Sequence, residues 1–185
     1  MAKSQAVRAQ ILDPFMAVLA TIGVTPNHLT LLSLLTGLAF CPIFIWFSKG
    51  LAFAMMVAHV VLDGLDGPLA RYTNVASNRG SFTDTTSDQV VVTFSTVTLI
   101  YTGFADIWPG ALYLFFYSVV VIFAMVRNAM KIPYSWLVRP RFMVYVWFPI
   151  EVYLWPGTLN GLLWIMTTLL ALKMLTGFIQ IRRKM

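Results

Sequence analysis

The sequence contains few charged residues: Asp, Glu, Lys and Arg make up 11% of 185 positions, against about a quarter in ordinary soluble domains. Hydrophobic residues make up 59%, and the mean hydropathy is +0.78. The apolar runs recur along the whole chain, which argues against a soluble domain on a single membrane anchor. We therefore expect an all-α integral membrane protein whose residues 1–185 form a single transmembrane domain.

Cysteine is nearly absent as well. Cys41 is the only one and lies inside an apolar run, so no intramolecular disulfide can form and the thiol is expected to be a packing residue. No small-residue cleavage site follows a short apolar core near the N-terminus, so we expect no signal peptide. The net charge of +6 does not indicate nucleic acid as a partner, because the basic residues lie between hydrophobic runs.

The chain before residue 25 has the pattern of a helix that lies in the membrane interface. Its apolar residues recur at three- and four-residue spacing, with polar residues between them, at Val7, Ile11, Phe15, Val18, Leu19 and Ile22. This predicts an interfacial amphipathic helix within residues 1–24, and Pro14 is a candidate break in it. The segment Thr25 to His28 then reads as a turn that starts the next helix.

Six membrane-spanning helices are predicted as a bundle over residues 25–181, with a basic tail at 182–185. Their approximate bounds are 29–47, 51–72, 84–104, 108–126, 142–155 and 159–179, the fifth with a kink at Pro149. The second span ends, and the third begins, with aspartates instead of apolar residues. Because successive spans are antiparallel, these polar ends meet on one side, where non-apolar helix requires a protein-lined, wet cavity.

The basic residues indicate the orientation of the bundle. With six spans, eleven of the thirteen fall on one side: Lys3, Arg8, Arg71, Arg79, Arg127, Lys131, Arg139, Arg141, Arg182, Arg183 and Lys184. An excess of Lys and Arg marks cytoplasmic loops, so we expect both termini and the aspartate cluster on the cytoplasmic side. Lys49 falls outside this group, and Lys173 inside the sixth span has no explanation from the sequence.

Four aspartates carry the chemistry. Asp63 and Asp66 are three residues apart and Asp84 and Asp88 four apart, so each pair lies on one face of its helix. Four ionised carboxylates in one membrane site would repel one another, and divalent metal would remove that cost. Oxygen ligands alone favour Mg²⁺ or Mn²⁺. The sequence thus predicts a metal site made by all four carboxylates.

Glycines and one arginine adjoin these aspartates. Gly64, Gly67 and Gly80 remove side chains where a ligand could approach closely, although the same spacing also serves helix packing. Arg71 lies one turn beyond Gly67 and suits a diphosphate, although a juxtamembrane arginine is equally explained by topology.

The pattern D-x-x-D-G-x-x-A-R-x8-G-x3-D-x3-D, which runs from Asp63 to Asp88, resembles that of the CDP-alcohol phosphotransferases at every fixed position. The segment Thr25 to Thr30 also resembles the family's segment before the first span. The resemblance implies six transmembrane helices, a homodimer, two Mg²⁺ or Mn²⁺ ions, and transfer of a phosphatidyl or phosphoalcohol group from a CDP-linked donor with release of CMP. It further implies that Asp63, Asp66 and Asp84 are metal ligands and that Asp88 is both ligand and general base. Nucleotide contacts are implied for Gly67, Ala70, Arg71, Gly80, Asn27 and Thr30.

The acceptor alcohol is not specified by these residues. His59 lies on the same helical face as Asp63 and is a candidate contact, with a hydrogen bond inside the bundle as the alternative. Arg127 and Lys131 are candidates for binding an acceptor phosphate, although topology also explains them. Gln89 stands where some relatives carry a basic residue, which argues against a phosphorylated acceptor.

Three functions remain open from the sequence. The first is transfer of a phosphatidyl group from CDP-diacylglycerol, or a similar CDP-lipid, to a small alcohol or phosphoalcohol. The second is the reverse arrangement, in which a CDP-linked choline or ethanolamine reacts with diacylglycerol. The third is a divalent-cation or proton transporter, which the apolar continuation of the second and third spans beyond Asp63 and Asp88 disfavours. Neither a Ser-His-Asp nor a Cys-His arrangement is evident, so direct attack by the acceptor alcohol is expected.

Overall fold

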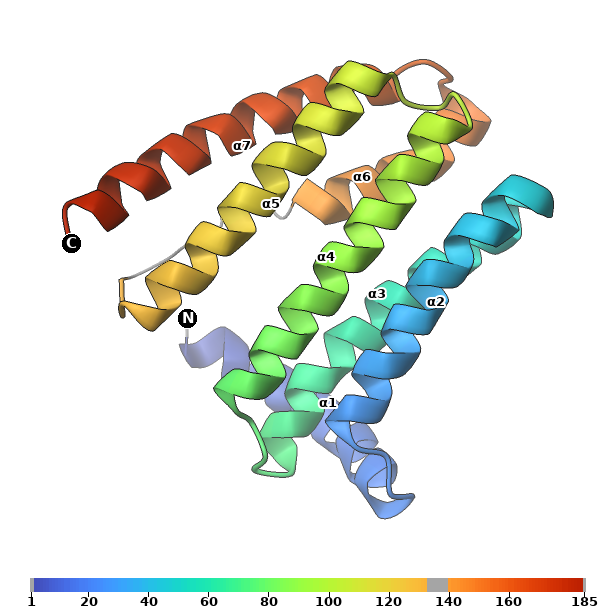
Figure 1. Cartoon of the computed structure of the whole chain (residues 1–185). Helices are drawn as coiled ribbons and strands as arrows, with labels where there is room; N and C mark the ends of the chain where they lie inside the picture. The colour runs from blue at the N-terminus through green and yellow to red at the C-terminus, as the bar shows by residue number, and fades with distance from the viewer. Residues whose placement is uncertain (1, 133–139, 185) are drawn as a thin grey trace.

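The structure, a computed structural model, describes residues 2–132 and 140–184, with side chains from residue 12 onward. These residues form α1 (Ala2–Thr21), α2 (Pro26–Trp46), α3 (Lys49–Tyr72), α4 (Asn78–Tyr101), α5 (Ile107–Ala129), α6 (Pro140–Pro149), the π-helix η1 (Ile150–Leu154) and α7 (Leu159–Arg182). Figure 1 shows long helices connected by short turns, with α1 crossing below α2 and α3. The described part of the chain contains no strand, which confirms the predicted all-α class.

Polar residues in the turns determine where the helices begin. Thr25 caps α2 by accepting a hydrogen bond from the backbone N–H of His28 at 3.3 Å, and the His28 ring accepts one from the N–H of Thr25. Ser48 and Ser77 cap α3 and α4 with their hydroxyl oxygens. An N-cap oxygen pairs an N–H that the helix cannot pair itself, so each polar segment fixes the start of the next helix. The predicted helix start at Thr25 to His28 is confirmed.

Four helices, α2, α3, α5 and α7, are long and apolar enough to cross a membrane, and the chain is an integral membrane protein. Their outward faces carry half-exposed apolar side chains, such as Leu35, Phe115 and Leu172, as expected where the surrounding solvent is lipid. Six spans were predicted. The other two predicted spans correspond to α4, whose first turns are polar, and to the short α6 with η1, and neither meets the same criteria.

Helix α2 is the element against which the two aspartate helices are held. It packs on both α3 and α4, while α5 packs on α4 and α7, and α6 contacts α3 and α7. Close approach of α2 and α4 depends on Gly37, because a Cβ there would lie 2.6 Å from Cγ2 of Val91. A cluster of aromatic rings fills the core at the other end, where Phe40 and Phe44 are stacked and Phe148 meets both edge-on. The aspartate-bearing ends of α3 and α4 are thereby fixed next to the start of α2.

Helix α1 is continuous through Pro14, so the candidate break at that residue does not occur. A proline removes one helical hydrogen bond, and packing can offset this loss. Met16, two residues later, is buried against Leu29 of α2 and Leu69 of α3. Helix α1 is therefore docked across the end of the bundle that carries the aspartates.

The helix type changes directly after Pro149, where the fifth predicted span was expected to kink. Helix α6 ends there and the π-helix η1 follows. Glu151 in η1 is 3% exposed, and its carboxylate accepts hydrogen bonds from the N–H groups of Gly157 and Leu159. Since Thr158 provides no side-chain cap, this carboxylate satisfies the first N–H of α7, that of Leu159, and the N–H of Gly157 in the preceding turn. Glu151 thus joins η1 to α7.

Candidate metal centre and nucleotide cavity

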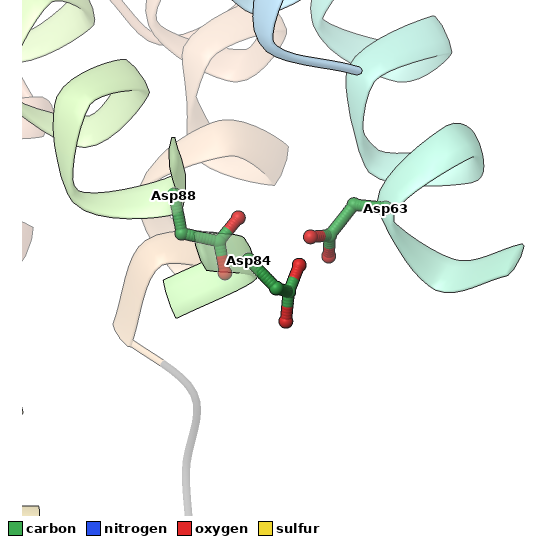
Figure 2. Close-up of side chains that lie close together, drawn as sticks. All are labelled: Asp63, Asp84 and Asp88. Atoms are coloured by element: carbon green, nitrogen blue, oxygen red, sulfur yellow. The ribbon is translucent and has the colours of Figure 1, made fainter. Parts of the chain in front are cut away.

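Three carboxylates converge at the end of the bundle near the turn between α3 and α4. Asp63, Asp84 and Asp88 each offer an oxygen within 4.8 Å of the others, and all three are partly buried. Figure 2 shows these carboxylates pointing toward one another, Asp63 from α3 and the other two from α4. Aspartates of α3 and α4 thus meet in one acidic cluster, as the sequence predicted.

Asp66 lies beside this cluster and outside the group of three. Its carboxylate is buried and accepts a hydrogen bond of 2.8 Å from the hydroxyl of Thr30 on α2. Asp84 lies close to both α3 carboxylates, Asp63 and Asp66. The four predicted ligands are therefore contiguous, but only three are close enough to share one ion through single oxygens.

Arg141 contacts the cluster directly, although the sequence indicated for it only a role in membrane orientation. Arg141, at the start of α6, donates from one guanidinium nitrogen to Oδ2 of Asp63 at 2.7 Å. Its other terminal nitrogen forms an ion pair with Oδ2 of Asp88. The arginine is buried, 9% exposed. No local pattern indicates this contact, because Arg141 looks like any other basic residue beside a span.

A cavity of about 1080 Å³ opens beside the acidic cluster, bounded by the ends of α1 and α3 and the starts of α2 and α4. Asp66 and Asp84 lie in its wall. So do all six residues for which the resemblance implied nucleotide contacts: Asn27, Thr30, Gly67, Ala70, Arg71 and Gly80. Arg79 adds a further cation to the wall. The cavity therefore combines carboxylates, hydroxyl and amide groups, and two arginines in a space large enough for a nucleotide.

The glycines of the aspartate motif do not pack closely against a neighbouring helix in the described part of the chain. A Cβ at Gly64 would have nothing within 4 Å, and one at Gly80 would meet only the hydroxyl of Ser77 at 3.5 Å. At Gly67 the nearest atom would be a guanidinium nitrogen of Arg71 at 3.4 Å. Close packing occurs instead at Gly37 and at Gly110, where a Cβ would lie 2.6 Å from Ile100. Gly67 and Gly80 lie in the cavity wall and Gly64 does not, and access for a ligand at these glycines stays a prediction.

The structure places His59 inside the bundle, away from the cavity wall. The ring is 2% exposed, its Nδ1 is 2.8 Å from the Ser33 hydroxyl, and it meets the Tyr145 ring edge-on. This is the arrangement expected of the alternative, a histidine hydrogen-bonded within the bundle.

The two basic acceptor candidates are also outside the cavity wall. Arg127 is buried on α5, and Lys131 is exposed just after it, in a left-handed backbone conformation with φ 56°. Gln89 donates a hydrogen bond of 2.7 Å to Ser118 and so ties α4 to α5. Arg139, which the sequence grouped with these charges, lies outside the described residues.

The residues present fit a hard divalent cation. The cluster offers only carboxylate oxygens, which suit Mg²⁺ and Mn²⁺, and no His or Cys belongs to it among the described residues. A positive group already lies against it, since Arg141 pairs with two of the three carboxylates. The site is therefore built to hold positive charge.

Comparison with known proteins identifies the class. The family model described as CDP-alcohol phosphatidyltransferase matches residues 23–179, which is most of the chain. The protein belongs to the CDP-alcohol phosphatidyltransferase family.

Curated relatives are similar over parts of the chain. A CDP-diacylglycerol–serine O-phosphatidyltransferase of Mycobacterium tuberculosis is 29% identical over 112 residues, 60% of this chain and 39% of the relative. An archaetidylinositol phosphate synthase of Pyrococcus horikoshii is 39% identical over 72 residues, 39% of this chain and 38% of the relative. That of Aeropyrum pernix is 26% identical over 126 residues, 68% of this chain and 58% of the relative. The chain thus spans less than two thirds of the length of these relatives.

Among solved structures, the fold is similar to that of phosphatidylinositol phosphate synthase of Mycobacterium tuberculosis. The form with CDP-DAG bound superposes with a TM-score of 0.77 at 17% identity, covering 91% of this chain and 92% of that one. The form in complex with manganese and citrate gives 0.75 at 18% identity, covering 89% and 86%. The likeness extends over nearly the whole bundle and shows that the two chains share a fold.

Proposed function

We propose that this protein transfers a phosphatidyl group from CDP-diacylglycerol, or an analogous CDP-lipid, to a small alcohol or phosphoalcohol, and releases CMP. The observation that carries the proposal is the acidic cluster of Asp63, Asp84 and Asp88 at the edge of a cavity of about 1080 Å³. Family membership supports it. So do the names of the relatives, one of which is a CDP-diacylglycerol–serine O-phosphatidyltransferase, and the CDP-DAG bound in the similar mycobacterial structure.

Asp63, Asp66, Asp84 and Asp88 would hold two Mg²⁺ or Mn²⁺ ions. The manganese in the similar mycobacterial synthase supports this assignment. Bound there, the metal would neutralise charge on the donor diphosphate and on the leaving phosphate.

The cavity residues bind and orient the CDP part of the donor. Arg71, whose guanidinium lies over Gly67, offers a fork of donors to phosphate oxygens. Because Gly67 has no side chain, the Arg71 guanidinium can lie close to the helix backbone there. Asn27 and Thr30, at the start of α2, supply polar groups across the cavity from Arg71 and Gly80.

Asp88 is the proposed general base. Its carboxylate would accept the proton of the acceptor hydroxyl while the acceptor oxygen forms a bond to the donor's lipid-bearing phosphorus. The bond between that phosphorus and the bridging diphosphate oxygen breaks, and its electron pair leaves with CMP. Asp88 suits this role because it stands at the inner end of the cluster, one turn beyond Asp84 and partly buried.

The membrane arrangement belongs to the same proposal. We infer that α4 and the α6–η1 segment complete six spans of one domain, and that α1 lies in the interface with Phe15 and Val18 exposed toward lipid. Basic residues at the ends of α3, α5 and α7 support a cytoplasmic location for the site and both termini. A homodimer is expected from the family resemblance.

Two alternatives are distinguishable. In the reverse arrangement, a CDP-linked choline or ethanolamine is the donor and diacylglycerol the acceptor, and this reaction would use the same cavity with different substrates. A transporter would need a polar route to the other side of the membrane. The large cavity instead lies at one end, and the core beyond it is closed by residues such as Phe40, Met56 and Phe148.

The test is CMP release from liposomes that contain CDP-diacylglycerol and purified protein. The acceptors are glycerol phosphate, inositol phosphate, serine, inositol, choline and ethanolamine, and CDP-choline and CDP-ethanolamine with diacylglycerol test the reverse arrangement. We expect CMP release with one acceptor, its loss with a chelator, and its recovery on adding Mg²⁺ or Mn²⁺. Ion flux without CMP release would refute the proposal.

The variant Asp88→Asn tests the base. It should remain folded and lose CMP release, because the amide cannot take the hydroxyl proton. Asp106→Asn is the matched control, since Asp106 is exposed at the start of α5 and its side chain makes no capping hydrogen bond there. Normal turnover in Asp88→Asn would show that another group is the base.

A further inference from the structure

Arg141 pairs with two of the three carboxylates that could hold a metal ion. Its two terminal nitrogens pair with Oδ2 of Asp63, at 2.7 Å, and with Oδ2 of Asp88. The arginine and aspartate side chains in these pairs are only 10–14% exposed, so the contacts are largely screened from water. The planar guanidinium of an arginine can bridge two carboxylates on different helices, and a lysine could not match this two-pronged geometry.

The charges at the site explain why such a bridge is needed. Four ionised aspartates would give the cluster a charge of −4, and Arg141, paired with Asp63 and Asp88, reduces it to −3. Carboxylates this close and this buried repel strongly. Arg141 therefore lowers the cost of holding α3 and α4 together before a divalent ion binds.

The same contact must oppose the metal. A divalent ion among Asp63, Asp84 and Asp88 would bind two of the carboxylates that Arg141 holds, and it would place two cations within a few ångströms of each other. Arg141 cannot lose its proton to relieve that repulsion, so it has to move or give up its hydrogen bonds.

We propose that Arg141 is a resident counter-cation of the carboxylate site, which bridges Asp63 and Asp88 in the metal-free protein and is displaced from them when a divalent ion binds. This rests on the proposed function, because it requires the same carboxylates to be the metal ligands. Arg141 is thus a positioning residue that sets the metal affinity. If Arg141 had a purely structural role, its removal would instead weaken metal binding, because loss of the bridge between Asp63 and Asp88 would loosen the ligands.

The experiment measures Mn²⁺ binding to the purified protein in detergent, by electron paramagnetic resonance of the free ion and without substrate. Arg141→Gln should bind Mn²⁺ at least about tenfold more tightly than wild type, because a cation at contact distance from the ion is removed. Arg141→Lys keeps the charge without the two-pronged bridge and should lie between them. Arg182→Gln removes an exposed arginine at the end of α7 and should behave as wild type.

Thermal unfolding keeps the proposal testable if the variant is fragile. Metal-free Arg141→Gln should unfold at a lower temperature than wild type, and added Mn²⁺ should raise its unfolding temperature by more than it raises that of wild type. Equal or weaker Mn²⁺ binding by Arg141→Gln, with a smaller stabilisation by Mn²⁺, would overturn the role of Arg141 and leave the metal site standing.

A different result would overturn the metal site itself. If wild type binds no Mn²⁺, or binds it equally well after Asp63→Asn, the carboxylates are not the ligands, and both the proposed function and the role of Arg141 fail.

Discussion

Replacement of Thr30 by valine should weaken catalysis without unfolding the protein. The Thr30 hydroxyl donates a hydrogen bond of 2.8 Å to Oδ2 of Asp66, and this carboxylate is buried in the wall of the cavity. Valine has nearly the same shape and no donor, so Asp66 would keep its place on α3 but lose the group that orients it. The hydroxyl's other hydrogen bond goes to the carbonyl of Pro26, one turn back in the same helix, and contributes little across the site.

The magnitude follows from the type of bond. A hydrogen bond to a charged group contributes about 1.5–3 kcal/mol, and partners that orient metal ligands typically account for about 10–100-fold in affinity or activity. We therefore expect kcat/KM for CMP release in Thr30→Val to fall by about tenfold or more. Apparent Mn²⁺ affinity should fall in parallel.

Two variants on the same helix serve as controls. Thr30→Ser keeps the hydroxyl and should retain most of the activity. Thr36→Val removes a hydroxyl that bonds only to carbonyls of its own helix, those of Leu32 and Ser33, and should match wild type. If Thr30→Val keeps wild-type kcat/KM, Asp66 does not depend on this hydrogen bond, and its place among the ligands comes into question.

Two further changes test the packing and the connection between helices. Gly37→Ala should lower the free energy of unfolding by about 1–3 kcal/mol, because the new Cβ would lie 2.6 Å from Val91. Gly67→Ala, whose Cβ would lie 3.4 Å from Arg71, should unfold at the wild-type temperature and raise the KM for the CDP-lipid. Equal unfolding temperatures for the two variants would contradict the packing role of Gly37. Glu151→Gln should lower the free energy of unfolding by about 1–3 kcal/mol, because a neutral amide cannot accept as strongly from the N–H groups of both Gly157 and Leu159. Thermal unfolding in detergent checks it. An unchanged unfolding temperature would show that water or another group caps α7 equally well.

Local regularity explains what could be predicted from the sequence. Helical periodicity alone places Asp63 and Asp66 on one face and Asp84 and Asp88 on another, and the turn between them is too short for the helices to part. Apolar runs of sufficient length likewise revealed α2, α5 and α7, whereas the span of α3 was predicted from a shorter apolar run extended by the segment that carries Asp63 and Asp66. The Thr-Pro start of α2 was readable because N-capping depends on residues three positions apart.

Contacts between residues far apart in the chain could not be predicted from local sequence patterns. Arg141 pairs with Asp63 across 78 residues, and nothing near Arg141 in the chain distinguishes it from a topology-determining charge. His59 had two interpretations until the packing of α2 on α3 placed it against Ser33, 26 residues away. The roles of Gly37 and Gly67 differ for the same reason, since only the position of a neighbouring helix separates a packing glycine from one that faces a cavity.

The sequence by itself therefore determined a membrane-embedded helical protein with an acidic motif suited to divalent metal, because hydropathy and helical spacing are properties of short segments. Tertiary structure decided which groups surround that motif: Thr30 on Asp66, Arg141 on Asp63 and Asp88, and a cavity bounded by four helix ends. These depend on how helices cross. A crossing is set by the sum of many side-chain contacts, and no single segment of the chain encodes it.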